Sequence, residues 1–274
     1  MARVRFISGR QFRCKVCGSV CSGGGSYSPE PATFSTTILR SRGDPSLSSG
    51  VIVEACVETV ASAVAAERAG ASRIELCSDL AEGGVTPSAG LIRAVRARVE
   101  IPLHVLIRPR GGEFIYDTAE EEVMLADITE ARRAGADGVV IGALSTGLRV
   151  HRARTERLVA AADSLSCTFH RAVDATPDLD ASVALLVELG VARILTSGGA
   201  ATALQGAATI GQLQVRWGER ITILAGGGIR AVNVRRILRE TGVRELHLGP
   251  RLPGSAEIDV AEVEAVIGML SSGA

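Results

Sequence analysis

The sequence predicts a (β/α)8 barrel, in which eight parallel strands alternate with eight helices. Eight short runs rich in β-branched residues follow one another along the chain, and an amphipathic helical stretch follows each run. Glycine ends several of these helices directly before the next run, where its left-handed conformation suits a helix C-terminus. These glycines are Gly70, Gly135, Gly190 and Gly242. Eight alternating units in roughly 220 residues favour a closed parallel barrel.

The elements can be placed in chain order from the same patterns. The strands are expected at about 51–57, 72–77, 102–107, 138–142, 166–170, 193–197, 221–225 and 244–248, with a last helix at about 259–270. Helix starts are indicated by the capping-box spacing of Thr118-Ala-Glu-Glu121 and by Pro87 and Pro177, which suit a first helical position. An open doubly wound sheet is the alternative, but no G-x-G-x-x-G pattern follows the first run.

Residues 1–50 differ from the rest of the chain. They are rich in Ser, Gly and Arg and show no sustained periodicity. We expect a disordered low-complexity extension before a barrel domain at 51–274; a targeting segment or an over-long start remain open. The cysteines of this segment have the spacing of half a zinc knuckle: Cys14, Cys17 and Cys21. A tetrahedral site needs a fourth ligand, and no His or Cys follows before Cys56.

Composition narrows the class of protein. The formal net charge is zero, so nothing favours bulk attraction to nucleic acid or to an anionic membrane surface. No apolar run approaches the roughly 20 residues of a membrane span. The only lysine, Lys15, precedes the barrel, which excludes Schiff-base chemistry from the folded body. Six cysteines are too few for a disulfide scaffold, so a cytoplasmic protein with buried thiols or a metal site is expected; a homo-oligomer is compatible with this composition.

Three of the expected strands carry the same polar pattern. The motifs are Glu54-Ala-Cys56, Glu75-Leu-Cys77 and Glu245-Leu-His247. Residues two apart in a strand point to one face, and Glu is almost never fully buried without a partner. Because closure places the eighth strand beside the first, these side chains are expected in one cluster. Arg108 and Arg110 are the expected partners of the buried carboxylates.

Active sites of such barrels lie at the carboxyl ends of the strands. The candidates for acid–base chemistry there are Glu54, Glu75, His104, Arg108, His170, Asp174 and His247. The candidates for anion binding are Arg108, Arg110, Ser197, Gly198, Gly199, Gly226, Gly227 and Gly228. In the alternative interpretation, the glycines serve only tight turns.

Cys56 and Cys77 are candidate metal ligands. Neighbouring strands lie about 4.8 Å apart, and a linear bridge with bonds of about 2.3 Å needs sulfurs roughly 4.6 Å apart. Thiolates favour Cu(I), zinc or iron–sulfur clusters. The alternative is that both cysteines only fill the core, as buried cysteines often do.

The chain resembles the CutC family of copper-homeostasis proteins over roughly residues 51–248. The resemblance rests on the run EACVETVASAVAAERAGASRIELCSDLAEGGVTPSAGLI, followed in order by IPLHVLIRPRGGEFIY, GADGVVIGAL, TFHRAVD, ILTSGG, GGGI and ELH. It implies a TIM-type barrel, cytoplasmic copper handling, and Cu(I) ligands at Cys56 and Cys77.

Two hypotheses about function follow. The first is a cytoplasmic copper-homeostasis protein that binds a copper ion, Cu(I), through Cys56 and Cys77. The second is an enzyme of the lyase or isomerase class that acts on a small anionic or phosphorylated metabolite through Arg, Glu and His at the same mouth. Thiols on neighbouring strands favour the first, and the arginine and glycine loops favour the second. A non-catalytic scaffold is a third alternative.

Overall fold

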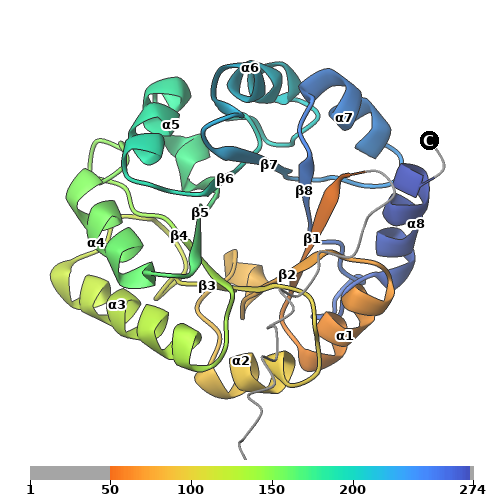
Figure 1. The fold of residues 1–274 in the computed structure, drawn as a ribbon, viewed down its shortest axis with the longest axis horizontal. Coiled ribbons are helices and arrows are strands. Elements are labelled where there is room, and N and C mark those ends of the chain that lie inside the picture. The colour runs from red at the N-terminus through yellow and green to blue at the C-terminus, as the bar shows by residue number, and fades with distance from the viewer. Residues whose placement is uncertain (1–49, 272–274) are drawn as a thin grey trace, which may run out of the picture. The chain divides into compact units, whose positions relative to one another are not determined.

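A computed structural model describes residues 50–271, which form a closed barrel of parallel strands (Figure 1). The strands lie in sequence order around the barrel, with the last beside the first. They are β1 (Ile52–Val57), β2 (Arg73–Leu76), β3 (Leu103–Leu106), β4 (Gly138–Ile141), β5 (Ser166–Phe169), β6 (Arg193–Thr196), β7 (Thr222–Gly226) and β8 (Glu245–Leu248). The predicted (β/α)8 barrel is confirmed. The prediction for the N-terminal extension, including Cys14, Cys17 and Cys21, falls outside the described residues apart from Gly50.

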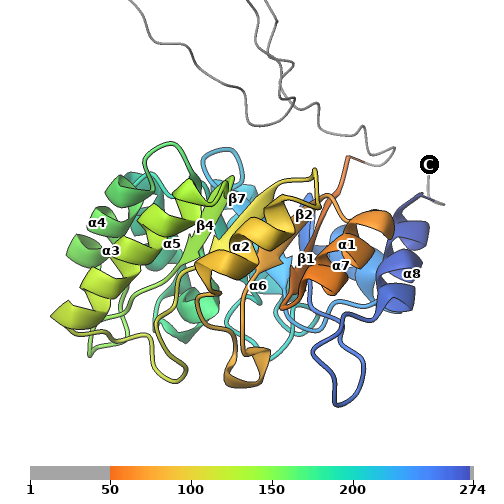
Figure 2. The ribbon, with the colours of Figure 1, turned by 90° about the horizontal axis from the view of Figure 1, so that it is seen from below.

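Helices surround the barrel, and the loops that follow the strands gather on one side of it, the lower side in Figure 2. The helices are α1 (Val60–Arg68), α2 (Ala89–Arg96), α3 (Thr118–Arg133), α4 (Arg152–Ala162), α5 (Leu179–Glu188), α6 (Ala207–Trp217), α7 (Val234–Thr241) and α8 (Val260–Ser271), with short 3-10 turns η1 (Leu80–Glu82) and η2 (Arg171–Ala175). Between residues 50 and 271 no helix has both the length and the apolar character that a bilayer span requires.

The predicted helix ends are confirmed, and the predicted helix starts are wrong by one or two residues. Gly70 and Gly135, which follow the ends of α1 and α3, have φ of +96° and +91°. The capping box of α3 is formed by Asp117 and Glu120, which each accept from the other's backbone N–H at 2.8 Å. An aspartate has taken the N-cap position that the spacing gave to Thr118, because its carboxylate is a strong acceptor for the free N–H groups.

The prolines expected at the first helical position also lie outside the helices. Ser88 caps α2 and Asp178 caps α5, so Pro87 and Pro177 each precede the cap residue. A side-chain oxygen that accepts a backbone N–H of the first turn fixes the helix start more strongly than the φ preference of proline.

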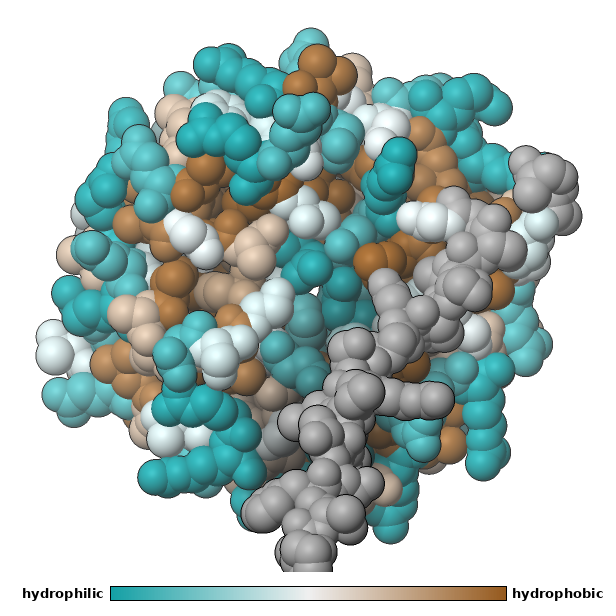
Figure 3. All heavy atoms as spheres, viewed as in Figure 1, coloured by the Kyte–Doolittle hydropathy of each residue, from teal (hydrophilic) through white to brown (hydrophobic). Residues whose placement is uncertain are grey.

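The strands bury two kinds of surface. Alternate residues such as Val53, Ile74 and Leu246 belong to the main apolar core. The residues between them include Glu54 and Arg73, which are buried in register with each other. Viewed along the barrel axis, hydrophilic residues gather at the hollowed centre of the face in Figure 3. A polar layer therefore fills part of the barrel.

A second, smaller apolar cluster is separate from the main core. Its buried members are Cys56, Cys77, Leu106 and Val140, with Leu80 packed against them. The two cysteines that the sequence singles out are thus neighbours of each other among apolar residues of β1 to β4.

Candidate functional site

The polar layer is held together by alternating charges on four strands. Arg73 lies between two carboxylates, with its Nε 2.5 Å from Oε2 of Glu54 and its Nη2 2.6 Å from Oε2 of Glu245. Oε2 of Glu245 also accepts a hydrogen bond from Nε of Arg193 at 2.6 Å. Burial alone would raise the pKa of Glu54, but the Arg73 guanidinium together with His247 and His104 outweighs burial and holds that pKa well below its usual range. Glu54 is therefore an ionised, buried carboxylate.

Arg108 and Arg110 are not the partners of the buried carboxylates, and that prediction is wrong. Arg108 donates to backbone carbonyls of the loops above it, those of Glu82, Gly84 and Gly112, at 2.7–2.9 Å. Arg110 pairs with Glu120 at the surface. The true partner, Arg73, was visible in the sequence as Arg73-Ile-Glu75, since a residue two before Glu75 shares its strand face.

His247 connects the charged layer to the thiols. Because β8 pairs with β1 in the register that places His247 opposite Glu54, its Nδ1 lies 2.8 Å from Oε1 of Glu54. Its Nε2 lies 3.6 Å from Oε2 of Glu75, and it also shares a hydrogen bond with Cys56. Burial alone would lower the pKa of His247, but the Glu75 and Glu54 carboxylates raise it well above its usual value. Burial raises the pKa of Glu75.

The thiols of Cys56 and Cys77 meet at the end of β1 and β2. Their sulfur atoms are 3.7 Å apart, and both residues are buried. The Cys77 thiol also donates to the carbonyl of Val57 at 3.6 Å. The hydrogen bond with Cys77, followed by burial, raises the pKa of Cys56 well above its usual value. Cys56 therefore holds its proton and lies in close contact with the sulfur of Cys77.

Five of the predicted site residues thus come together. The ligand atoms of Cys56, Glu75 and His247 all lie within 4.8 Å of one another, with Glu54 behind His247 and Cys77 beside Cys56. The expectation that closure of the barrel unites the three strand motifs is confirmed. The set offers two sulfurs and one imidazole nitrogen, together with carboxylates that can accept a proton.

His104 and His170 are buried, neutral side chains. His104 lies in the same layer, with Nδ1 4.0 Å from Oε2 of Glu54. His170 lies on β5's side of the barrel, where its Nδ1 accepts the N–H of Ala172 at 3.1 Å. Burial lowers the pKa of each to about 3. His170 therefore lies apart from the cluster and caps η2.

Asp174 and the turn Ser197–Gly199 satisfy each other. The Asp174 carboxylate accepts the N–H groups of Ser197 and Gly199, each at 3.0 Å, and the hydroxyl of Thr196 at 2.5 Å. The N–H of Gly198 donates to the Thr196 hydroxyl at 2.9 Å. The backbone donors that the sequence suggested for an external anion are thus already bound to the Asp174 carboxylate and the Thr196 hydroxyl of the chain itself.

The second glycine turn, Gly226–Gly228, allows close packing. A Cβ at Gly226 would lie 2.5 Å from Leu195 and 3.2 Å from His247, so a side chain there would collide with the cluster. Gly227 and Gly228 have φ of +108° and +69°, a region that favours glycine. These positions support the alternative interpretation, in which glycine serves the turn.

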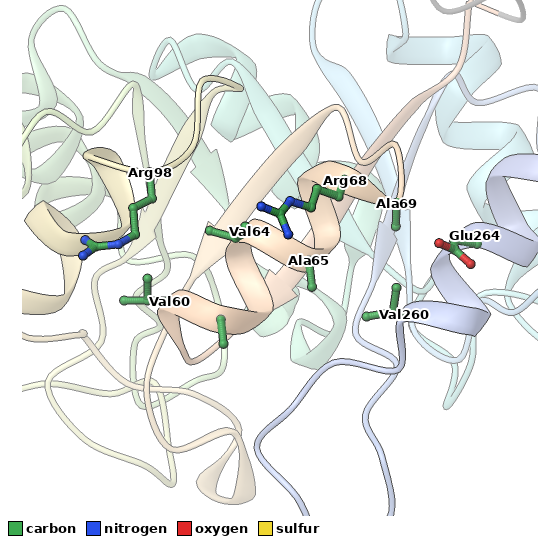
Figure 4. A pocket seen from close by; sticks show the side chains of 9 residues that line it. Val60, Val64, Ala65, Arg68, Ala69, Arg98, Val260 and Glu264 are labelled. Atoms are coloured by element: carbon green, nitrogen blue, oxygen red, sulfur yellow. The ribbon is translucent and has the colours of Figure 1, made fainter.

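The surface has a hollow near the carboxyl ends of the strands and another on the outside of the barrel. One of about 620 Å³ is formed by the loops after β1, β2, β7 and β8, and includes Glu58, Arg230 and Arg251. The other, of about 740 Å³, lies between α1 and α8 (Figure 4). Its lining is largely apolar, with Val64, Ala65 and Val260, and it contains none of the predicted site residues.

Comparison with known proteins gives a consistent result. The model of the CutC family matches residues 51–251. A family protein CutC from Xanthomonas campestris pv. campestris is 41% identical over 237 residues, which cover 80% of this chain and 99% of that protein. A copper homeostasis protein cutC homolog from Mus musculus is 46% identical over 211 residues, 77% of this chain and 78% of that protein.

A solved structure agrees with the sequence comparisons. The crystal structure of CutC from Streptococcus agalactiae has a TM-score of 0.68 and 35% identity. The match covers 72% of this chain and 97% of that one. The fold and the sequence therefore point to the same group of proteins.

Proposed function

The chain belongs to the CutC family, and from that premise we propose that it is a cytoplasmic copper-homeostasis protein that binds Cu(I) through Cys56 and Cys77. The observation that carries this proposal is the 3.7 Å distance between the two sulfur atoms, which come from neighbouring strands and lie in a buried cluster of apolar side chains. The name of the mouse relative supports copper as the ion. Thiolates are the protein ligands that suit Cu(I) best.

The distance between the two sulfur atoms needs to change only slightly for both to bind one Cu(I). With bonds of about 2.3 Å, two sulfurs lie roughly 4.6 Å apart in a linear site and roughly 4.0 Å apart in a trigonal one. The observed 3.7 Å is closer to the trigonal value. A trigonal site needs a third donor, and the imidazole of His247 is the nearest group of suitable chemistry.

The surrounding carboxylates prepare His247 for this role. Glu54 fixes the orientation of the ring through Nδ1, which leaves Nε2 for the thiol side. The carboxylate of Glu75, whose pKa burial raises, lies 3.6 Å from Nε2 and can take its proton. Outer partners of this kind orient a ligating histidine and tune its basicity.

A Cu(I) competition assay with reduced protein tests the proposal. Because Cys14, Cys17 and Cys21 are further thiols, the full chain is used with these three replaced by serine. We expect one Cu(I) per chain, and loss of that binding in Cys56→Ser/Cys77→Ser. Cys167→Ser is the matched control, since Cys167 is a buried thiol in the main core. Equal affinity of the double variant and the control would reject the proposal.

The role of His247 and the cytoplasmic location of the protein are tested separately. His247→Gln should weaken Cu(I) binding by about tenfold or more, as loss of a ligand or its support does. An unchanged affinity would limit the site to the two thiolates. Fractionation of cells followed by immunoblotting checks the cytoplasmic location.

A further inference from the structure

The hollow of about 620 Å³ lies at the mouth of the barrel, on the same side as the thiol cluster but formed by other residues. It is formed by Glu58 after β1, Asp79 after β2, Arg230 after β7, and Gly249 and Arg251 after β8. These loops project together on the lower side of the barrel in Figure 2. The hollow therefore lies where barrels of this type bind their ligands.

The hollow borders the thiol cluster. A Cβ at Gly249 would lie 3.8 Å from the Cβ of Cys56, which is ordinary contact distance. Glu58, another lining residue, follows Cys56 by two residues. The hollow therefore lies next to the thiol cluster.

The guanidinium groups of the two arginines in the hollow make few hydrogen bonds. Among residues 50–271, the guanidinium of Arg230 donates only to the carbonyl of Ile229, at 2.8 Å. Arg251 has a contact of 3.5 Å with Glu58 as its side-chain partner in the same part of the chain. A guanidinium carries five N–H donors, so most donors of both groups are available to a ligand. Both terminal nitrogens of Arg108, by contrast, donate to backbone carbonyls, and Arg110 pairs with Glu120.

We propose that this hollow binds the phosphate group of a small phosphorylated ligand through Arg230 and Arg251. Two guanidinium groups from separate loops match a doubly charged tetrahedral anion better than a singly charged carboxylate. Their position after β7 and β8 is where such barrels commonly hold phosphate. The inference is independent of copper binding, because neither arginine contacts a thiol.

Two carboxylates, those of Glu58 and Asp79, also line the hollow and weaken its attraction for an anion. Glu58 accepts the N–H of Leu80 at 2.7 Å, and that hydrogen bond disperses part of its charge. Asp79 is exposed at the edge and has φ of +53°, an uncommon conformation for a residue with a side chain. Its charge opposes a bound anion, so its removal should strengthen binding.

Calorimetric titration of the full chain with inorganic phosphate, at fixed ionic strength, tests the proposal. We expect Arg230→Met and Arg251→Met each to weaken phosphate binding by about tenfold, the usual effect of losing a charged hydrogen-bond donor. Asp79→Asn should strengthen it several-fold. Arg236→Met is the matched control, because Arg236 pairs with Glu240 on the exposed face of α7, and it should change affinity by less than about twofold.

Acetate and the cysteine variant complete the experiment. Acetate should bind about tenfold more weakly than phosphate or worse, since it carries one charge. Cys56→Ser/Cys77→Ser should bind phosphate as the parent does, which separates this site from the copper proposal. The inference is overturned if phosphate does not bind, if both arginine variants match the Arg236 control, or if acetate binds as well as phosphate. Unchanged thermal midpoints of the variants establish that they remain folded.

Discussion

The β1–β2–β8 side of the barrel mouth and the β5–β6 side both carry polar clusters that the sequence predicts as functional, but they are built in opposite ways. On the β5–β6 side, the Asp174 carboxylate accepts donors from Thr196, Ser197 and Gly199 and also pairs with Arg171 at 3.0 Å. On the β1–β2–β8 side, the thiols of Cys56 and Cys77 make only sulfur hydrogen bonds, to each other, to the carbonyl of Val57 and to the ring of His247.

The difference shows which polar cluster is a candidate for a ligand. A carboxylate with a donor at every oxygen stabilises the loops around it, and binding of a ligand would first have to break those bonds. Thiols make only weak hydrogen bonds, so a pair of them loses little when a metal ion binds in place of those bonds. Residue type alone does not separate these cases, whereas the count of satisfied donors and acceptors does.

The largest effect is expected in the charged layer beneath the thiols. Arg73→Leu should destabilise the protein by about 3–5 kcal/mol, because it leaves Glu54 buried without its main cation. Glu245 keeps Arg193, so Glu54 is the stranded charge. Urea denaturation measures the loss.

The double variant Arg73→Leu/Glu54→Gln separates charge from packing. It should recover part of the loss, because the unpaired carboxylate disappears with its partner. A coupling of more than about 1 kcal/mol in the double-mutant cycle is expected for groups in contact. Strictly additive losses would show that the layer is held by packing rather than by this ion pair.

On the β5–β6 side, Asp174→Ala should cost about 2–3 kcal/mol, since buried N–H and hydroxyl donors lose their acceptor. Glu219→Ala, at an exposed position, is the control and should change stability by less than about 0.5 kcal/mol. The Cu(I) affinity of Asp174→Ala should equal that of the parent. A fall in Cu(I) affinity with little loss of stability would reverse the assignment of the two sides.

The barrel and its motifs could be predicted from the sequence because each depends on local patterns. Strand runs, glycine helix ends and the period-2 motifs need only neighbouring residues, and closure then brings Glu54, Glu75 and His247 together. The family resemblance pointed to the same two cysteines.

The partners of the charged groups could not be predicted in the same way. Arg108 was a reasonable cation for the buried carboxylates, but its side chain turns to the carbonyls of Glu82, Gly84 and Gly112. Those contacts depend on loop conformation, which a periodic pattern does not specify. The same holds for Asp174 of η2. Whether its carboxylate reaches the N–H groups of the Ser197–Gly199 turn depends on how η2 folds back. The hollow at the mouth likewise arises from four loops distant in sequence.

Cu(I) binding should depend on pH on the β1–β2–β8 side. Because the pKa of Cys56 is raised well above its usual value, its thiol holds a proton at neutral pH, and binding must release it. The affinity should therefore rise about tenfold per pH unit for each proton released. Competition assays between pH 6 and pH 8 measure the slope. An affinity that is constant over this range would show that no thiol proton is displaced.

The smallest expected effect comes from the histidine of the opposite side. Burial lowers the pKa of His170 to about 3 from 6.5, so the unfolded chain takes up this proton first as the pH falls. The stabilising contribution of the neutral ring is complete above about pH 6.5 and is lost as the pH falls towards 3, at about 1 kcal/mol between pH 7 and pH 5.5. His170→Asn keeps an acceptor for the N–H of Ala172, as asparagine is a good cap, but it cannot titrate. Urea denaturation of the variant should therefore give a flatter dependence of the unfolding free energy on pH below 6.5 and the same slope as the parent above pH 7.5. His247 has the opposite shift, since carboxylates raise its pKa, so it adds nothing to this loss. His104, whose pKa burial also lowers to about 3, contributes equally in parent and variant, so their difference reports on His170. If parent and variant lose stability in parallel below pH 6.5, His170 is not a buried neutral ring.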